Sequence, residues 1–350
     1  MRRTTAWHKT RLVASAFCIM AAENHMHNGN SNASHSAVQT GLQSMDLLRS
    51  LNVAKLFELT CISDDEFEKW LMSANLLPRS RFCECGCEMR VKRWRMRKAW
   101  RCKRKCCARL KGYYAGTFFH GAHVAVKEIF KLSYYWCVGT YSMDRVQQAL
   151  RRQNGRTFSV RSIIDWYGFF RGVCAGYFRQ NPVRLGGKGK EVVIEEVMVM
   201  QEQTRKIKRG REHWGFAGTE SGSSARFIEE IGEDLNADSL FAMIGKYILP
   251  GSEVVSTLFK KYKYEDDEKV RDAYEHLATT NSLRFVDAKA GQREGAIGKI
   301  WHRFKCTHNK KLDERTVPST HIKEFMWRRL FDGSDCMYNL WSQIASNYTF

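Results

Sequence analysis

The chain has 350 residues, which is longer than one typical domain and predicts two or three folded units. Hydrophobic residues make up 43% of it and aromatic residues 12%, which argues against wholesale disorder. The formal net charge of +20 and the pI near 9.5 favour a polyanionic partner, with nucleic acid first and an anionic membrane surface second. No stretch approaches the roughly 18–20 apolar residues of a membrane span, so we expect no membrane-embedded segment.

Residues 1–45 are predicted to be a disordered tail, because 23–45 are rich in Asn, His and Ser with little periodic apolar content. Arg2, Arg3 and Arg11 precede a short apolar run over 12–22, which resembles a signal or mitochondrial presequence. The rest of the chain favours the nucleus or another DNA-containing compartment, and we expect a nuclear protein.

Helices are expected over 46–78, where apolar residues recur at helical spacing. Ser63 followed by Asp64, Asp65 and Glu66 is a typical helix start, and Pro78 ends this unit.

Most of the positive charge lies in the next segment. Between Arg79 and Lys111 there are fourteen Lys and Arg residues against Glu84 and Glu88, a local excess of +12. More than half of the net charge therefore lies in less than a tenth of the chain. Such a concentration indicates an interaction surface, although a merely soluble basic protein is the plainer alternative.

Six of the twelve cysteines lie in the same basic module, predicted over 79–119. Clustered cysteines among Lys and Arg favour a metal site in a reducing compartment over a disulfide framework. Structural zinc takes four tetrahedral ligands, usually from two close groups of cysteines. Here the two groups, separated by a strand-like stretch from Met89 to Trp100, are Cys83, Cys85 and Cys87, and Cys102, Cys106 and Cys107. This pattern describes a zinc ribbon, and the expected ligands are Cys83 with Cys87 or Cys85, plus Cys102 with Cys107. Free buried cysteines are the alternative.

Cationic and apolar residues alternate between the two cysteine groups, and in a hairpin this predicts one cationic and one apolar face. The apolar members are Val91, Trp94, Met96 and Trp100. The cationic side chains would neutralise phosphates without reading the base sequence, whereas the alternative is a solvated basic face. The candidate DNA-contacting residues are Arg90, Lys92, Arg93, Arg95, Arg97, Lys98, Arg101, Lys103, Arg104, Lys105, Arg209 and Arg211.

A helical region is predicted over 120–182, with helices at about His120–Val138, Ser142–Gln153 and Val160–Phe178. The last two flank the turn Asn154-Gly155-Arg156 and form a helix-turn-helix-like pair. The turn-rich stretch from Leu185 to Lys190 then marks a plausible domain boundary.

An α/β domain is predicted over 183–331, because strands come first, followed by a crossover helix and a further strand. The expected strands are Glu191–Met200, His213–Thr219, Arg226–Ile231 and Glu253–Ser256, and the expected helices are Ala237–Ile248, Glu294–Lys305 and Pro318–Phe331. Residues 332–350 are predicted to be a C-terminal tail.

Several short motifs follow one another along the chain; they include Trp100-Arg101-Cys102, Gly116-Thr117-Phe118-Phe119, Ile164-Asp165-Trp166-Tyr167, Gly186-Gly187-Lys188-Gly189, Ile194-Glu195-Glu196, Trp214-Gly215-Phe216-Ala217-Gly218, Ile248-Leu249-Pro250-Gly251-Ser252, Phe285-Val286-Asp287 and Glu324-Phe325-Met326-Trp327. In this order they resemble the insertion-sequence XO2-like transposases, called the Merlin superfamily in animals, over residues 76–330. The resemblance implies a DNA partner and a ribonuclease H-like domain, in which three acidic residues hold two Mg²⁺ or Mn²⁺ ions for strand cleavage and transfer.

The three positions that correspond to the family's acidic residues are Glu195, Thr257 and Gly298. Hard divalent cations need oxygen ligands, preferably carboxylates, so two of the three ligands are missing. We therefore expect a transposase-derived DNA-binding protein that has lost catalysis. Two alternatives remain: an active transposase that uses displaced carboxylates such as Glu294, and a zinc-dependent RNA- or chromatin-binding module with a C-terminal dimerisation scaffold. A homodimer is compatible with each.

Overall fold

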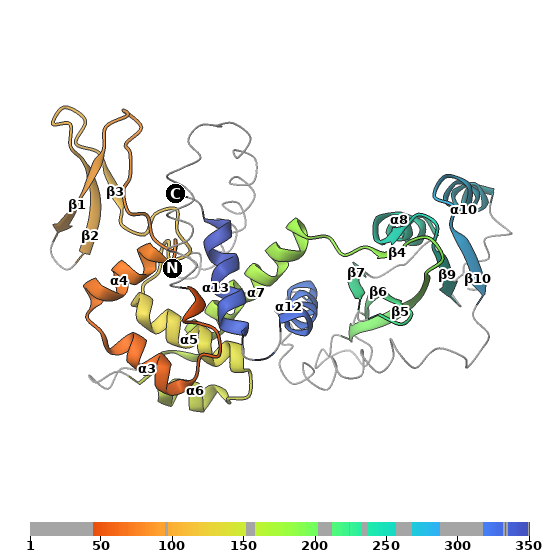
Figure 1. The fold of residues 1–350 in the computed structure, drawn as a ribbon, viewed down its shortest axis with the longest axis horizontal. Coiled ribbons are helices and arrows are strands. Elements are labelled where there is room, and N and C mark those ends of the chain that lie inside the picture. Colours follow the sequence, from red (N-terminus) through yellow and green to blue (C-terminus); the bar gives the residue numbers. More distant parts are fainter. Residues whose placement is uncertain are drawn as a thin grey trace, which may run out of the picture.

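The computed structural model describes residues 45–94, 97–151, 158–201, 212–223, 225–232, 237–256, 268–287, 318–331, 333, 335–348 and 350. Helices and sheets combine in an α/β protein, as the sequence predicts. Figure 1 shows α3–α7 and α13 in one group, the five-stranded sheet with α8 and α10 in another, and α12 between them. Residues 1–44 of the expected tail over 1–45 and the expected helix Glu294–Lys305 lie outside the described residues, whereas Met45 is buried in the core.

A helical body is built from six helices. They are α3 (Val53–Cys61), α4 (Asp64–Ser73), α5 (Val126–Val138), α6 (Met143–Ala149), α7 (Val160–Gln180) and α13 (Cys336–Asn347). The start of α4 is the one expected from the sequence, because Ser63 and Glu66 form a reciprocal capping box. Within the described residues, no helix is both long and apolar enough to cross a membrane.

The prediction of a C-terminal tail over 332–350 is wrong, because α13 belongs to the core of the helical body. Trp341 is fully buried, its ring stacks on Phe119 at 5.9 Å, and its Nε1 donates a hydrogen bond to Ser133 Oγ at 2.9 Å. The buried residues of this helix recur at helical spacing: Met337, Leu340, Trp341 and Ile344. The apolar periodicity that predicts the other helices was therefore present here as well.

The five-stranded sheet has the strand order β10-β9-β5-β6-β7. Its strands are β5 (Glu191–Gln201), β6 (Glu212–Glu220), β7 (Arg226–Gly232), β9 (Glu253–Ser256) and β10 (Arg284–Asp287). The first three form an antiparallel meander, and β9 and β10 continue the sheet in parallel on the other side of β5. The helices α8 (Ala237–Tyr247) and α10 (Glu268–Thr280) connect the parallel strands. Neither α10 nor β10 was predicted from the sequence.

A short two-stranded sheet joins the predicted domain boundary to the segment before β9. Its strands, β4 (Leu185–Gly186) and β8 (Ile248–Leu249), are parallel. Gly186 has a φ of +89°, and a Cβ atom added there would lie 2.1 Å from Ser252 Oγ. Only glycine fits this turn, which holds β4 against the loop before β9.

Candidate metal centre and the basic ribbon

Residues 81–112 form a three-stranded antiparallel sheet with its flanking turns, called here the basic ribbon. Its strands are β1 (Met89–Trp94), β2 (Arg97–Cys102) and β3 (Leu110–Gly112), in the order β1-β2-β3. The predicted hairpin is therefore present, and β3 is an addition to it. Figure 1 shows the ribbon projecting beyond the helices, with α4 beneath it.

The inner face of the ribbon is apolar near the cysteines. Met89, Trp100 and Cys102 are all buried, and they share this face because Met89 pairs with Cys102 and side chains alternate along each strand. The Trp100 ring stacks on Tyr113 at 5.9 Å, and its Nε1 donates to the Tyr113 carbonyl at 3.2 Å. The ribbon therefore has a small core of its own.

Two predicted DNA contacts, Arg93 and Lys98, lie on this inner face instead of a separate cationic face. Lys98 Nζ is 2.8 Å from Asp65 Oδ1 and 2.6 Å from Glu68 Oε2, both on α4, and Arg93 also binds Asp65. The ion pairs with Lys98 and Arg93 lower the pKa of Asp65. Arg93 and Lys98 thus hold the ribbon to α4, a role that residue spacing in β1 and β2 does not indicate.

Two further cations of the ribbon, one of them a predicted DNA contact, are also paired with acidic side chains. Lys103 forms an ion pair with Glu88, and Arg109, which is outside the predicted set, forms one with Glu84. These pairs tie the two cysteine-bearing turns together across the sheet. These two glutamates are already subtracted in the excess of +12, so the further loss of free cations comes from the ion pairs of Arg93 and Lys98 with α4.

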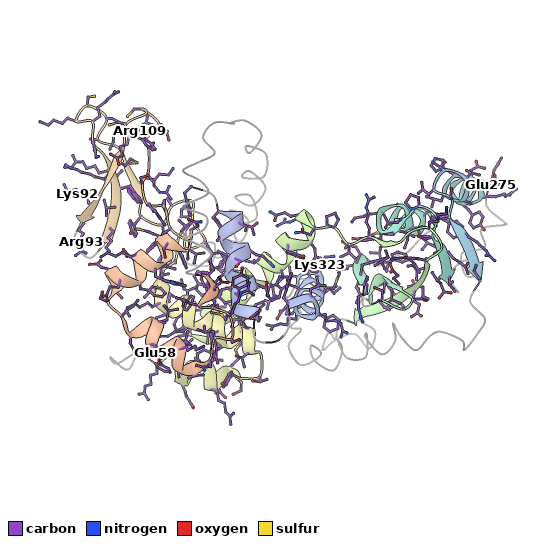
Figure 2. All side chains as sticks on the ribbon, in the orientation of Figure 1. Glu58, Lys92, Arg93, Arg109, Glu275 and Lys323 are labelled. Atoms are coloured by element: carbon purple, nitrogen blue, oxygen red, sulfur yellow. The ribbon has the colours of Figure 1, made fainter. Side chains whose placement is uncertain are left out.

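Four of the predicted DNA contacts have no ion pair to a carboxylate within the described part of the chain. Arg90, Arg104 and Lys105 are exposed, and Arg101 is half-buried. Lys92 is also half-buried. In Figure 2, Arg93 is labelled at the end of the hairpin nearer α4, and Arg109 at the end farthest from the helices. Of the other candidates, Arg95, Arg209 and Arg211 lie outside the described residues, and for Arg97 only the backbone is described.

Four cysteine sulfur atoms meet at the outer end of the ribbon. The Sγ atoms of Cys83, Cys85, Cys102 and Cys107 all lie within 4.8 Å of one another. The Cys83–Cys107 and Cys85–Cys102 sulfur distances are both 3.6 Å. A tetrahedron with zinc–sulfur bonds of about 2.3 Å has sulfur atoms about 3.8 Å apart, whereas a disulfide bond is about 2.05 Å long. The four sulfurs could therefore hold a metal ion, and the donor set is compatible with zinc.

Backbone amides support the thiolate form in this cluster. The N–H of Cys87 donates to Cys85 and lowers the pKa of its thiol to about 7. Burial raises the pKa of Cys102 to about 12, although the N–H of Arg104 opposes this. A cation at the centre would favour thiolates at both residues, because metal ligands must be deprotonated. The sequence indicates roles for the side chains of Cys87 and Arg104, and sequence reasoning missed their backbone N–H groups because backbone groups leave no mark in a motif.

The other two candidate ligands are outside the cluster. Cys106 is exposed and Cys87 is half-buried, and neither sulfur joins the four. The structure thus selects Cys85 from the two alternatives left open by the spacing. Among the described residues, no other group of His, Cys, Asp and Glu side chains has this spacing.

Of the three positions expected to correspond to the family's acidic residues, only Glu195 lies within the described residues. It lies half-buried on β5, in register with Ala217 of β6. Ser256, the last residue of β9, donates from its Oγ to the Ile194 carbonyl at 2.8 Å, so the end of β9 lies beside this part of β5. Thr257 and Gly298 lie outside the described residues.

No protein-family model, curated protein or solved structure matches this chain.

Proposed function

We propose that this chain is a transposase-derived nucleic-acid-binding protein that contacts DNA through the basic ribbon, with zinc holding the ribbon's outer turns. One observation carries the proposal: the segment with a charge excess of +12 is also the segment whose four cysteine sulfurs lie within 4.8 Å of one another. A nuclear location is part of the same proposal.

Zinc at this position would act structurally. Four thiolates leave no open coordination position for a substrate, which is typical of structural and not catalytic zinc. Cys83 and Cys85 would anchor the turn before β1, and Cys102 and Cys107 the turn after β2. Arg101 and Arg104 flank Cys102 and Lys105 follows, so the ion would fix the backbone that carries these cations. Phosphate contacts from a fixed frame lose less side-chain and backbone entropy on binding.

The five-stranded sheet supports the ribonuclease H-like part of the proposal. Its first strand, β5, is central, and β9 is parallel to it and ends at Ser256. This order suits a domain in which an acid on the first strand and another just after a later strand converge. Glu195 occupies the first of these positions.

The proposal includes the loss of two-metal catalysis. The hydroxyl of Thr257 and the hydrogen of Gly298 cannot replace two carboxylate ligands, so the donor set does not fit Mg²⁺ or Mn²⁺.

The second candidate is an active enzyme that uses a displaced carboxylate. The position of one acidic residue, Asp287, favours it. The backbone of Asp287 ends β10 in register with Ser256, two strands from β5. Neighbouring strands are about 4.8 Å apart, which places this backbone about 10 Å from β5. A nicking assay on end-labelled duplex DNA with Mn²⁺ separates the candidates. Clear nicking that Glu195→Ala or Asp287→Ala abolishes would overturn the inactive assignment.

Binding to duplex DNA at graded salt concentrations tests the main proposal. We expect affinity to fall steeply with salt, and Arg104→Gln to weaken binding and reduce the slope of log affinity against log salt by about 1. Lys55→Gln, at an exposed lysine of α3, is the matched control and should leave the slope unchanged.

Two results would contradict this proposal. Equal slopes for the Arg104 and Lys55 variants would exclude the ribbon as the contact surface. Tighter binding to duplex RNA than to duplex DNA would favour the RNA-binding module instead.

A further inference from the structure

The outer face of the basic ribbon, opposite the cysteine cluster and α4, carries cations and apolar side chains in adjacent rows. Arg90 pairs with Arg101, and Arg101 with Leu110, so these three form one row. Phe82 bridges to Glu88, which precedes Met89, so Phe82 belongs to the next row of the same face. Rows on one face of a sheet are about 7 Å apart. An aromatic ring therefore lies one row away from two guanidinium groups.

Phe82 and Leu110 are 69% and 66% exposed, the highest fractions among the large hydrophobic side chains of the described residues. Single exposed apolar residues are ordinary on protein surfaces. Phe82 and Leu110 are the two most exposed of these side chains and share one small cationic face, so they are not scattered singly. Their position indicates a surface that buries apolar groups only when a partner is bound.

The backbone around Phe82 is fixed on both sides. The Arg81 guanidinium donates to the Ala115 carbonyl, and the Cys83 N–H donates to the Cys87 carbonyl at 2.8 Å. Cys83 also belongs to the four-sulfur cluster. The ring therefore projects from an anchored segment and cannot fold back onto the inner face. An anchored ring loses little freedom when a ligand packs on it.

The charge of the outer face indicates which class of molecule can bind there. Arg90 and Arg101 make no ion pair with a carboxylate in the described part of the chain, whereas Lys103 in the row of Phe82 is paired with Glu88. The free charge on this face is thus positive and lies beside the apolar side chains. A polyanion that also presents flat apolar surfaces is complementary to it, and single-stranded DNA has both properties.

We propose that the outer face binds single-stranded DNA, with a base stacked on Phe82 and the backbone phosphates at Arg90 and Arg101. Leu110, on β3 at the opposite edge of this face, packs against another part of the same strand. Base faces are accessible only when bases are unpaired, whereas a duplex offers mainly phosphates to a flat cationic surface. This inference rests on the proposed function, since it names the form of DNA that the ribbon takes.

Fluorescence anisotropy with a labelled single strand and its duplex tests the inference. We expect Phe82→Ala to weaken single-strand binding about tenfold and to leave duplex binding unchanged. The slope of log affinity against log salt should also stay the same. Arg90→Gln should instead reduce the slope by about 1. Phe82→Trp should restore single-strand affinity, and a strand containing 2-aminopurine should lose fluorescence on binding the wild-type protein but not Phe82→Ala.

Val91→Ala is the matched control, because Val91 is an exposed apolar residue of β1 on the opposite face. It should leave single-strand affinity unchanged. Metal content and thermal unfolding of each variant establish that the ribbon is still folded.

The outcomes separate this inference from the proposed function. Equal single-strand affinity for wild type and Phe82→Ala would overturn the inference, and so would an equal loss on single strand and duplex, which indicates a wedge in duplex DNA. In both cases salt-dependent duplex binding leaves the proposed function standing. Absence of binding to either form overturns both.

Discussion

Cys85 and Cys87 have the same side chain and are two residues apart, yet only Cys85 contributes its sulfur to the four-sulfur cluster. The local turn makes the difference. The Gly86 N–H donates to the Cys83 carbonyl at 2.8 Å, and Gly86 has a φ of +76°, a conformation that glycine adopts without strain. The Cys87 N–H then donates to the Cys85 sulfur. Cys85 therefore offers a sulfur atom for the proposed zinc ion, and Cys87 supplies a backbone donor.

The different roles of Cys85 and Cys87 predict different effects when each is replaced by serine. Cys85→Ser should lower zinc affinity more than about a hundredfold, because it removes a ligand itself rather than one of its outer partners. Cys87→Ser should have little effect, since its backbone N–H remains. Competition with a chromophoric chelator measures both affinities. Equal losses for the two variants would show that the cluster is assembled differently.

At the scale of elements, α12 (Pro318–Phe331) is held by a buried charged group. Arg328 donates from Nε to Glu324 at 2.8 Å and from its other nitrogens to the carbonyls of Trp136 and Cys137, at 2.7 and 3.0 Å. It thereby satisfies carbonyls at the end of α5, a common role for arginine at a helix C-terminus. Burial raises the pKa of Glu324, but the Arg328 and Arg171 guanidinium groups outweigh it, and the net pKa is lowered.

Glu324→Gln should therefore reduce the free energy of unfolding by about 3 kcal/mol at neutral pH, because it leaves buried arginines without their counter-ion. A lowered pKa means that the carboxylate stabilises fully above its ordinary value near 4.5, and that this contribution is lost as pH falls through the lowered value. The difference from wild type should thus shrink on acidification below about 4.5. Urea unfolding across this range measures it.

Glu275→Gln, at an exposed glutamate of α10 labelled in Figure 2, provides the control and should change stability by less than about 0.5 kcal/mol. If the difference in unfolding free energy between wild type and Glu324→Gln stayed constant down to acidic pH, Glu324 would not be the ionised carboxylate assigned to it.

At the scale of the whole molecule, the C-terminal helices connect parts of the chain that are far apart in sequence. Lys323 of α12 binds Glu229 of β7 at 2.6 Å, and Tyr247 donates to the same carboxylate at 2.5 Å. Figure 2 labels Lys323 between the helical body and the sheet. Beyond α12, Trp341 of α13 completes the core of the helical body. The last part of the chain therefore completes a core to which residues 45–77 and 118–133 also contribute.

Trp341→Ala should lower the free energy of unfolding by about 4 kcal/mol, because it opens a large cavity and removes the hydrogen bond to Ser133. Leu330→Ala, at a position that is 57% exposed, should cost less than about 0.5 kcal/mol. Denaturant unfolding followed by circular dichroism gives both values. A similar small cost for both would mean that α13 is dispensable for the helical body.

Several elements followed from the sequence because their signals are local. The Ser63 capping box, the hairpin alternation from Met89 and the β-branched run of β5 depend on residues within a few positions of one another. Helix α10 and strand β10 were missed, and α13 was taken for a tail although its apolar spacing is helical. Strand β10 has only 4 residues, which carry too few alternating positions for a strong signal, whereas α10 and α13 have 13 and 12 residues and their length does not explain why they were missed.

The sequence by itself determined the α/β class, the charge concentrated before residue 112 and the two groups of cysteines. Only the tertiary structure decided that Cys85 and not Cys87 joins the cluster, that Lys98 binds α4, and that Phe82 and Leu110 share the outer face with Arg90 and Arg101. The physical reason is that spacing fixes the side of a strand on which a residue lies, but not what covers that side. The covering residues, such as Asp65 and Glu68 of α4, come from elsewhere in the chain and meet the ribbon only when the protein folds.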